Sequence, residues 1–217
     1  MADEETPTGN KLLGRDADLT GWILTLKDAP YYAHHGRFVQ RYTGVESALH
    51  LMFRHVLGSG DETGRAISGG MRLADVINTT KRLMKTRNLP VAQQDDFKAI
   101  TDHLGEITKL RDFLVHRSSY FDGRIVTSTN ETTSKSVDDI QVLKLNIKDI
   151  DGAANDCARV MFRIAALIWG PNHGLPPEAV QNMLEPWSYK HRQPETPNRV
   201  SRSNPQEPQH PPPPSSS

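Results

Sequence analysis

The sequence predicts a mainly α-helical protein, a bundle of four to five helices with a β-hairpin inserted between the third and fourth main helices. Three observations favour this class. Four segments carry apolar residues at the three- and four-residue steps of an amphipathic helix. Between the last two of these segments lies a stretch that alternates apolar and polar residues and is rich in β-branched residues. Both ends of the chain are polar. Four principal helices joined by loops are typical of a helical bundle.

Each helical segment is defined by its apolar stripe and by the residues that stop it. The first ends at Gly58, the second near Pro90, and the fourth at Gly170-Pro171, because Gly and Pro terminate helices. The third begins near Gln93 and is expected to end around His116. The stripes, in chain order, are Phe38, Tyr42, Val45, Leu49, Met52, Phe53 and Val56; Leu73, Val76, Ile77, Thr80, Leu83 and Met84; Phe97, Ile100, Leu104, Ile107 and Leu114; and Cys157, Val160, Met161, Ile164 and Ile168.

The remaining segments complete the domain organisation. GRIVTSTN (123–130) and DIQVLKLNI (139–147) read as the two strands of a hairpin, with the polar NETTSKS between them as a long, mobile loop. An additional short helix is expected over Leu19–Leu26. We expect residues 1–16 to be a flexible N-terminus, 17–187 to be the helical domain, and 188–217, rich in Pro and Ser, to be a disordered tail with almost nothing to bury.

Composition narrows the functional classes. Lys+Arg 26 balances Asp+Glu 26, so an RNA or lipid partner would need a local patch rather than an overall field. No run approaches a membrane span, and the acidic N-terminus lacks the apolar stretch of a signal peptide, so a soluble, cytoplasmic protein is expected. The lone Cys157 excludes an internal disulfide. No spacing of His, Cys, Asp or Glu matches a metal site, so neither a metal nor a cofactor is expected.

Arg111 interrupts the apolar stripe of the third helical segment. On an ideal helix at about 100° per residue, the apolar residues of this segment fall in an arc of roughly 100°, and Arg111 falls inside that arc. An arginine on a core-facing stripe costs free energy unless its guanidinium is paired or reaches water. We therefore expect Arg111 either to pair with a buried carboxylate or to point into a wet pocket.

His116 follows Arg111 by five residues, where the helix is expected to end. On a straight helix the two side chains are about 140° apart, so they do not share a face. A frayed or bent last turn would bring them together; alternatively, a second subunit completes the site. Asp112 stands four residues before His116, a spacing at which its carboxylate can touch the imidazole. Capping and salt bridges at a helix C-terminus also fit these residue types, so spacing alone leaves both interpretations open.

The stretch Arg-Asp-Phe-Leu-Val-His (111–116) resembles the R-x4–6-H signature of the HEPN superfamily, in which a polar residue commonly follows the arginine; here that residue is Asp112. The position agrees, because the motif closes a long helix and precedes a hairpin segment and a further apolar helix. RFVQRYTGVESALHLMF (37–53) is similar to the opening helix of such domains. The resemblance covers the chain from about residue 20 to about residue 170.

The resemblance implies a HEPN-like helical bundle that forms a homodimer and brings two R-x4-H motifs together in a cleft. Many members of the superfamily are metal-independent endoribonucleases, nucleases that serve as toxins, antiviral defence effectors or RNA-processing enzymes. It therefore implies an RNA-binding hydrolase in a defence, stress or toxin system, restrained by an antitoxin or another regulatory protein. Other members have lost catalysis, so the alternative is a non-catalytic helical module that binds a protein partner or a nucleotide.

The residue types suit cleavage of RNA by its own 2′-hydroxyl, which leaves a 2′,3′-cyclic phosphate. This reaction needs proton transfer and charge neutralisation. An imidazole exchanges protons near neutral pH, so His116 is suited to act as general base or acid. The planar cation of Arg111 suits a phosphate whose negative charge grows in the transition state. Asp112 is expected to hold the imidazole, and the His116 of a second copy would supply the second proton-transfer group.

Four further residues are candidates around the motif. Lys109, Arg117 and Arg124 flank it and are expected either to follow an RNA backbone or to be solvated surface residues. Glu46 lies at the edge of the first apolar stripe. It is expected either to pair with Arg111 across the bundle or to contact His50 one turn further along its own helix.

Overall fold

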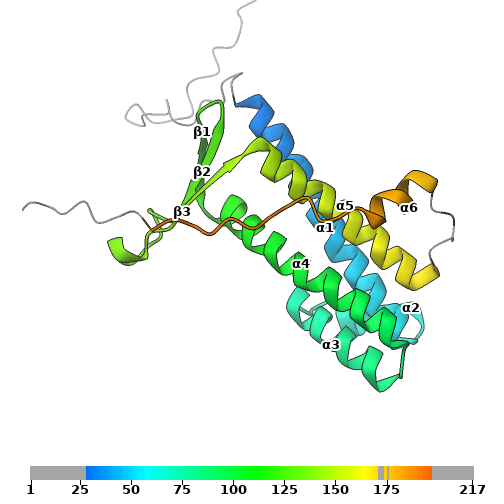
Figure 1. The fold of residues 1–217 in the computed structure, drawn as a ribbon. Helices are drawn as coiled ribbons and strands as arrows, with labels where there is room; N and C mark the ends of the chain where they lie inside the picture. Colours follow the sequence, from blue (N-terminus) through cyan, green and yellow to red (C-terminus); the bar gives the residue numbers. More distant parts are fainter. Residues whose placement is uncertain (1–27, 171–173, 175, 197–217) are drawn as a thin grey trace, which may run out of the picture.

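The computed structural model describes residues 28–170, 174 and 176–196, and this part of the chain is mainly helical (Figure 1). Its elements, in chain order, are α1 (Ala29–Leu57), α2 (Asp61–Ser68), α3 (Leu73–Thr86), α4 (Val91–His116), β1 (Ser118–Phe121), β2 (Ile125–Thr129), β3 (Val142–Asn146), α5 (Ile147–Trp169) and α6 (Pro177–Leu184). A 3-10 turn, Val137–Asp139, lies between β2 and β3. The expected helix at Leu19–Leu26 and the flexible terminus at 1–16 lie outside the described residues.

The four expected helices are confirmed as α1, α3, α4 and α5. The whole apolar stripe of α1 is buried, and α1 ends at Gly58, whose left-handed φ of 62° lets its amide bond the carbonyls of Arg54 and His55. A capping box between Asn146 and Asp149 starts α5. The short helices α2 and α6 were not predicted. Within the described residues, no helix is both long and apolar enough to cross a membrane.

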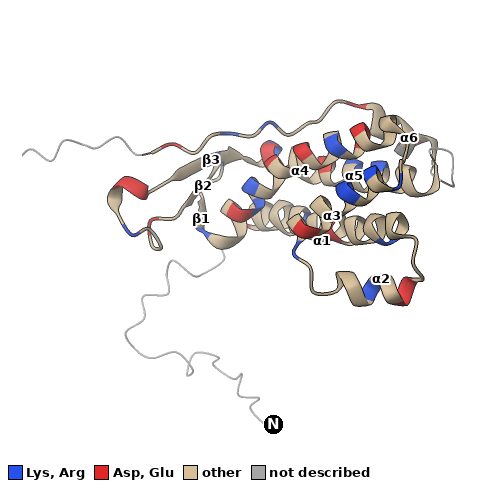
Figure 2. Ribbon diagram, turned by 90° about the horizontal axis from the view of Figure 1, so that it is seen from below, with Lys and Arg blue, Asp and Glu red and all other residues tan. Residues whose placement is uncertain are grey.

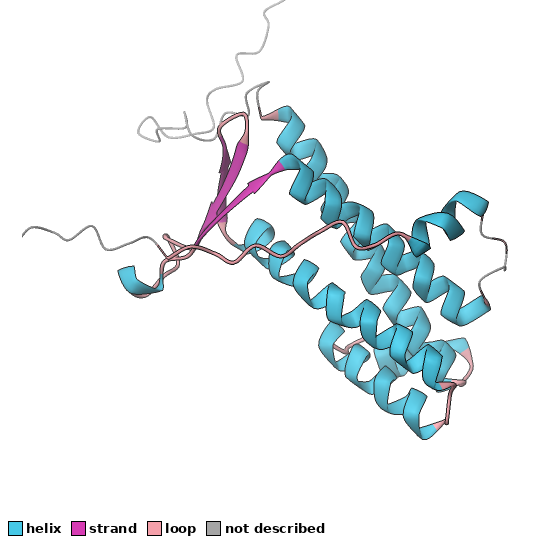
Figure 3. Cartoon of the chain, viewed as in Figure 1, coloured by secondary structure: helices cyan, strands magenta, loops and turns pink. Residues whose placement is uncertain are grey.

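The helices form the body of the molecule and a small sheet stands at one end of it (Figure 3). Helix α1 packs against α5 and α3, and α4 packs against α5 and α3 in turn. The core between them is apolar, and Phe38, Phe53 and Phe97 are among its largest fully buried side chains. Cys157 is fully buried in this core, as expected for a small apolar side chain.

The sheet has three antiparallel strands in the order β1-β2-β3. Its β2–β3 pair is the expected hairpin, with Val126 opposite Leu145 and Ser128 opposite Leu143. Strand β1, which follows α4 directly, was not predicted. The connection between β2 and β3 was expected to be a long, mobile loop; in the structure it is folded around Asn130, whose side chain bonds the amide of Gln141 and the carbonyl of Asp139.

The sheet is joined to the end of α4 by a buried hydrogen bond. The Ser128 hydroxyl donates to the Phe113 carbonyl at 2.8 Å. That carbonyl is one of the last four of α4, which have no partner inside the helix. The bond therefore fixes the orientation of the sheet relative to the last turn of α4, where Arg111 and His116 lie.

The C-terminal segment departs from the prediction. A disordered tail was expected from residue 188, but residues 185–196, which we call the strap, run from α6 across the helices to β3 (Figure 1). Tyr189 in the strap is 3% exposed. The backbone of Glu195 exchanges hydrogen bonds of 2.8 and 2.9 Å with that of Val142. For residues 188–196 the prediction is wrong, because Tyr189 is buried and the backbone groups of the strap find partners that composition does not reveal; residues 197–217 lie outside the described residues.

The strap is held by a buried carboxylate. Asp156 of α5 is fully buried and accepts from the amides of Ser188 and Tyr189 at 2.9 and 2.8 Å. It also accepts from Arg159 at 2.6 Å and contacts His103 at 2.9 Å. Trp187 of the strap stacks on His103 with ring centroids 4.2 Å apart. The strap is thus part of the folded domain.

Candidate functional site

Arg111 and His116 meet at the C-terminal end of α4. The Nη1 atom of Arg111 lies 3.2 Å from Nε2 of His116 within one chain. The helix stays regular through His116, and the backbone becomes extended only at Arg117. The frayed last turn considered from the sequence is therefore not needed. The long arginine side chain spans the angle between the two positions.

A hydrogen bond across this 3.2 Å contact is compatible with only one form of the imidazole. A guanidinium has only N–H donors, so Nε2 of His116 must accept. This requires a neutral imidazole with its proton on Nδ1. In this form Nε2 is the basic atom of the ring, and it faces the Arg111 guanidinium.

Asp112 contacts Arg111 rather than His116. Its Oδ1 atom lies 2.8 Å from Nη1 of Arg111, and the structure has no hydrogen bond between Asp112 and the His116 ring. The hydrogen bond that the guanidinium donates to the Asp112 carboxylate raises the pKa of Arg111, against the smaller opposing effect of burial. The expectation that Asp112 holds the imidazole is therefore not matched by this geometry, in which Asp112 holds the guanidinium.

Glu46 of α1 also faces Arg111. Its Oε1 atom lies 4.0 Å from Nη2 of the guanidinium, and no hydrogen bond or ion pair joins Glu46 to His50. Of the two alternatives for Glu46, the structure has the cross-bundle pair. Arg111 is 31% exposed and both carboxylates are at least as exposed. Of the two alternatives for Arg111, a buried carboxylate partner is not found among the described residues, and Arg111 lies at a solvent-accessible edge between α1 and α4.

Tyr42 forms the floor beneath Arg111 and was counted from the sequence only as a core residue. The Arg111 guanidinium lies 5.4 Å from the centre of its ring, within the range of a cation–π contact. The Tyr42 hydroxyl lies 2.9 Å from Oγ1 of Thr108, which itself donates to the Leu104 carbonyl at 2.8 Å. Since the Thr108 proton is used, Tyr42 donates to Thr108. Burial raises the pKa of the Tyr42 phenol, partly offset by Thr108 and Arg111.

The three flanking cations are not gathered around the motif. Lys109 pairs with Glu106 at 3.0 Å on the surface of α4. Arg117 lies 3.7 Å above the Phe113 ring and donates to Gln141 at 3.1 Å. Arg124 lies in the β1–β2 turn, at the opposite end of β1 from His116. Lys and Arg residues are interspersed with Asp and Glu residues along the described helices (Figure 2).

Among the described residues, no group of three or more His, Cys, Asp and Glu side chains is arranged to hold a metal ion. The residues that come together are Arg111, Asp112, His116 and Glu46, with Tyr42 beneath them. Comparison of the chain with protein-family models, with curated proteins and with solved structures finds no match. The chemistry of this cluster is therefore the basis for a functional assignment.

Proposed function

We propose that the protein is a metal-independent endoribonuclease of the HEPN type. The observation that carries the proposal is the 3.2 Å contact between the Arg111 guanidinium and the His116 imidazole at an exposed helix end. The pair combines a phosphate-binding cation with a neutral base. Cleavage of RNA by its own 2′-hydroxyl needs these two functions and supplies its own nucleophile.

In the proposed reaction, the guanidinium of Arg111 turns to the non-bridging oxygens of the scissile phosphate. This frees Nε2 of His116, which accepts the proton of the 2′-hydroxyl as O2′ attacks phosphorus. The bond between phosphorus and O5′ then breaks, and a 2′,3′-cyclic phosphate forms. The leaving O5′ takes a proton from a second acid, for which we propose the protonated His116 of another copy in a homodimer.

The other residues have supporting roles in this scheme. Asp112 holds the guanidinium beside the imidazole, and Tyr42 keeps it from turning into the bundle. Val115, 43% exposed between the motif residues, and Tyr120, 61% exposed on β1, give the surface around His116 an apolar component suited to a second copy. An antitoxin or regulatory protein that covers this surface would restrain the activity.

A second candidate is a non-catalytic helical module that binds a protein partner or a nucleotide. It is favoured by one observation: two cations that flank the motif in the sequence already have intramolecular partners. Lys109 forms an ion pair with Glu106, and Arg117 lies over the Phe113 ring and donates to Gln141. A nucleotide or a protein carboxylate needs only Arg111, whereas a long RNA needs several phosphate contacts. The two candidates differ in whether a covalent bond of RNA is broken.

Incubation of the purified protein with mixed RNA in the presence of EDTA distinguishes them. The endoribonuclease is expected to produce fragments that end in a 2′,3′-cyclic phosphate. Intact RNA under these conditions, together with saturable binding of a mononucleotide, would favour the binding module.

A further inference from the structure

Both terminal nitrogens of the Arg111 guanidinium have a carboxylate opposite them. Nη1 faces Asp112 at 2.8 Å and Nη2 faces Glu46 at 4.0 Å. Arginine binds a phosphate best through two parallel N–H donors. Asp112 accepts a hydrogen bond from Nη1, and Glu46 lies at ion-pair distance from Nη2, so a phosphate that binds both terminal nitrogens meets at least one carboxylate.

The guanidinium has little freedom to avoid this competition. It lies over the ring of Tyr42, which is itself fixed by the hydrogen bond to Thr108. Its nitrogen edge is therefore directed toward Glu46, Asp112 and His116. Movement inward is blocked by the buried Tyr42, so a phosphate must approach along the outer edge where the carboxylates lie.

Of the two carboxylates, Glu46 is the one in the position of an incoming ligand. Asp112 neighbours Arg111 in sequence and moves with it on α4. Glu46 comes from α1, makes the longer contact, and stands across from the guanidinium. Burial is the main cause of the raised pKa of the Tyr42 phenol beneath Arg111, and the charges of Glu46 and Asp112 act in the same direction.

We propose that the Glu46 carboxylate occupies the place of a phosphate oxygen in the unliganded protein, and that it sets the affinity of Arg111 for RNA by competing with the phosphodiester. The identity of the ligand as RNA rests on the proposed function. One guanidinium faces two carboxylates, so these three groups together present a net negative charge to an arriving phosphodiester. Without the Glu46 charge, the guanidinium and the Asp112 carboxylate together have a net charge of zero.

The size of the effect follows from Coulomb's law. Two like charges about 6 Å apart in a fully water-like medium change an equilibrium constant by about threefold, and by more in a less polar surrounding. Glu46→Gln is therefore expected to bind RNA at least about threefold more tightly than the wild type. Glu46→Ala removes the charge without leaving the amide that Gln introduces, and it is also expected to bind RNA more tightly than the wild type.

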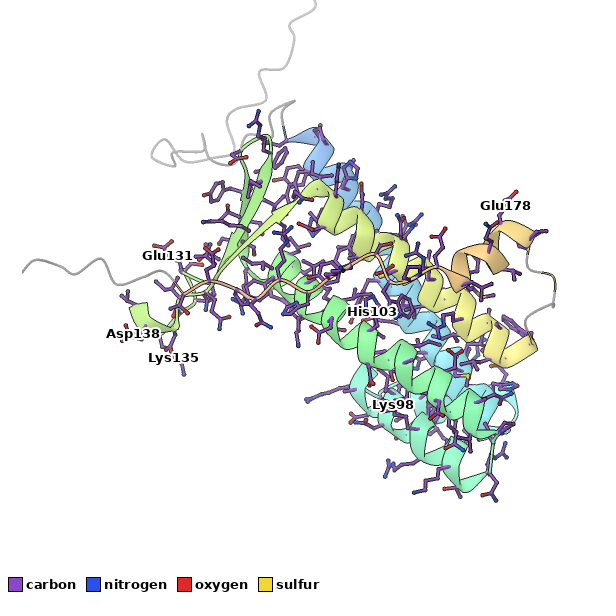
Figure 4. All side chains as sticks on the ribbon, in the orientation of Figure 1. Lys98, His103, Glu131, Lys135, Asp138 and Glu178 are labelled. Atoms are coloured by element: carbon purple, nitrogen blue, oxygen red, sulfur yellow. The ribbon has the colours of Figure 1, made fainter. Side chains whose placement is uncertain are left out.

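The test uses a fluorescent 2′-O-methyl RNA oligonucleotide, which has no free 2′-hydroxyl and cannot be cleaved by this route. Dissociation constants are measured by fluorescence anisotropy at low salt for the wild type, Glu46→Gln, Arg111→Ala and the double variant. Glu178→Gln is the matched control, because it removes the same charge from α6 at the far end of the molecule from the sheet (Figure 4). The expected result is a gain for Glu46→Gln that falls to the control value in the Arg111→Ala background.

Three outcomes would overturn the proposal: unchanged or weaker binding by Glu46→Gln, a gain that persists fully without Arg111, or no oligonucleotide binding by any variant. The test does not depend on catalysis. If Glu46→Gln gains affinity through Arg111 while the wild type leaves cleavable RNA intact, the competition by Glu46 stands and the endoribonuclease proposal fails.

Discussion

Two arginines in similar ion pairs are expected to differ sharply in their contribution to stability. Arg111 pairs with Asp112 and Glu46 at an edge where its side chain is 31% exposed. Arg159 pairs with Asp156 at 2.6 Å and with Glu185 at 2.5 Å, and its side chain is 11% exposed. Arg111→Ala and Arg159→Ala remove the same chemical group. The difference between their effects on the free energy of unfolding therefore reports how accessible each ion pair is to solvent.

The magnitudes follow from these environments. An exposed ion pair contributes about 0.2–1 kcal/mol and an exposed cation–π contact about 0.5–1 kcal/mol. Arg111→Ala should therefore lower the free energy of unfolding by about 1–2 kcal/mol. Arg159→Ala leaves the fully buried Asp156 without its main cation, and breaking a buried pair costs about 3–5 kcal/mol.

Urea denaturation followed by circular dichroism at neutral pH measures both values. Lys98→Ala, which removes an exposed ion pair with Asp102, provides the baseline for a pair in contact with water. If Arg111→Ala destabilises the protein as much as Arg159→Ala does, the description of Arg111 as a water-facing residue is refuted, and its role is that of a structural core ion pair.

Three further predictions concern buried groups. Burial raises the pKa of the Cys157 thiol to about 12, so an alkylating reagent at pH 8 should modify it only at the rate of unfolding; rapid labelling of the native protein would contradict this. Burial opposes ionisation of Asp156, but its hydrogen bonds hold its pKa below the ordinary 3.8. Its contribution to stability is present above that value and is lost as the pH falls through the lowered folded pKa, so urea titrations of Asp156→Asn should depend less on pH below about 4 than those of the wild type. Ser128→Ala should cost about 1–3 kcal/mol by leaving the Phe113 carbonyl buried without its donor, and a melting temperature equal to that of the wild type would show that the bond is dispensable.

The long amphipathic elements could be predicted from the sequence because their apolar periodicity is itself what packs them. Helices α1, α3, α4 and α5 and the β2–β3 pair follow this rule. Helix α2 has Gly64 in its middle and few apolar residues, so no stripe marks it. Strand β1 spans Ser118–Phe121 and is too short for alternation to stand out. Short elements depend on tertiary partners, which a single sequence does not display.

In the strap and at the candidate site, the side-chain contacts likewise could not be predicted from the sequence. Nothing in the sequence marks Asp156, and only the fold brings the Ser188 and Tyr189 amides to its carboxylate. The residues of the motif could be identified from the sequence, but ideal helix angles placed the His116 and Arg111 side chains on different faces. The arginine side chain is long enough to cancel that separation. Tyr42 was assigned to the core correctly, yet its ring also supports Arg111, which periodicity alone does not indicate.

Cleavage of RNA by the wild type and by His116→Ala, in EDTA and at equal protein concentration, tests the proposed function most directly. The wild type is expected to yield 2′,3′-cyclic phosphate ends, and His116→Ala is expected to lose cleavage while it keeps the circular dichroism spectrum of the wild type. The exposed imidazole at the helix end contributes at most about 2 kcal/mol to stability, so loss of activity would not reflect unfolding. His116→Ala protein that cuts RNA at the wild-type rate, or wild-type protein that leaves RNA intact, would contradict the assignment of Arg111 and His116 as a catalytic pair.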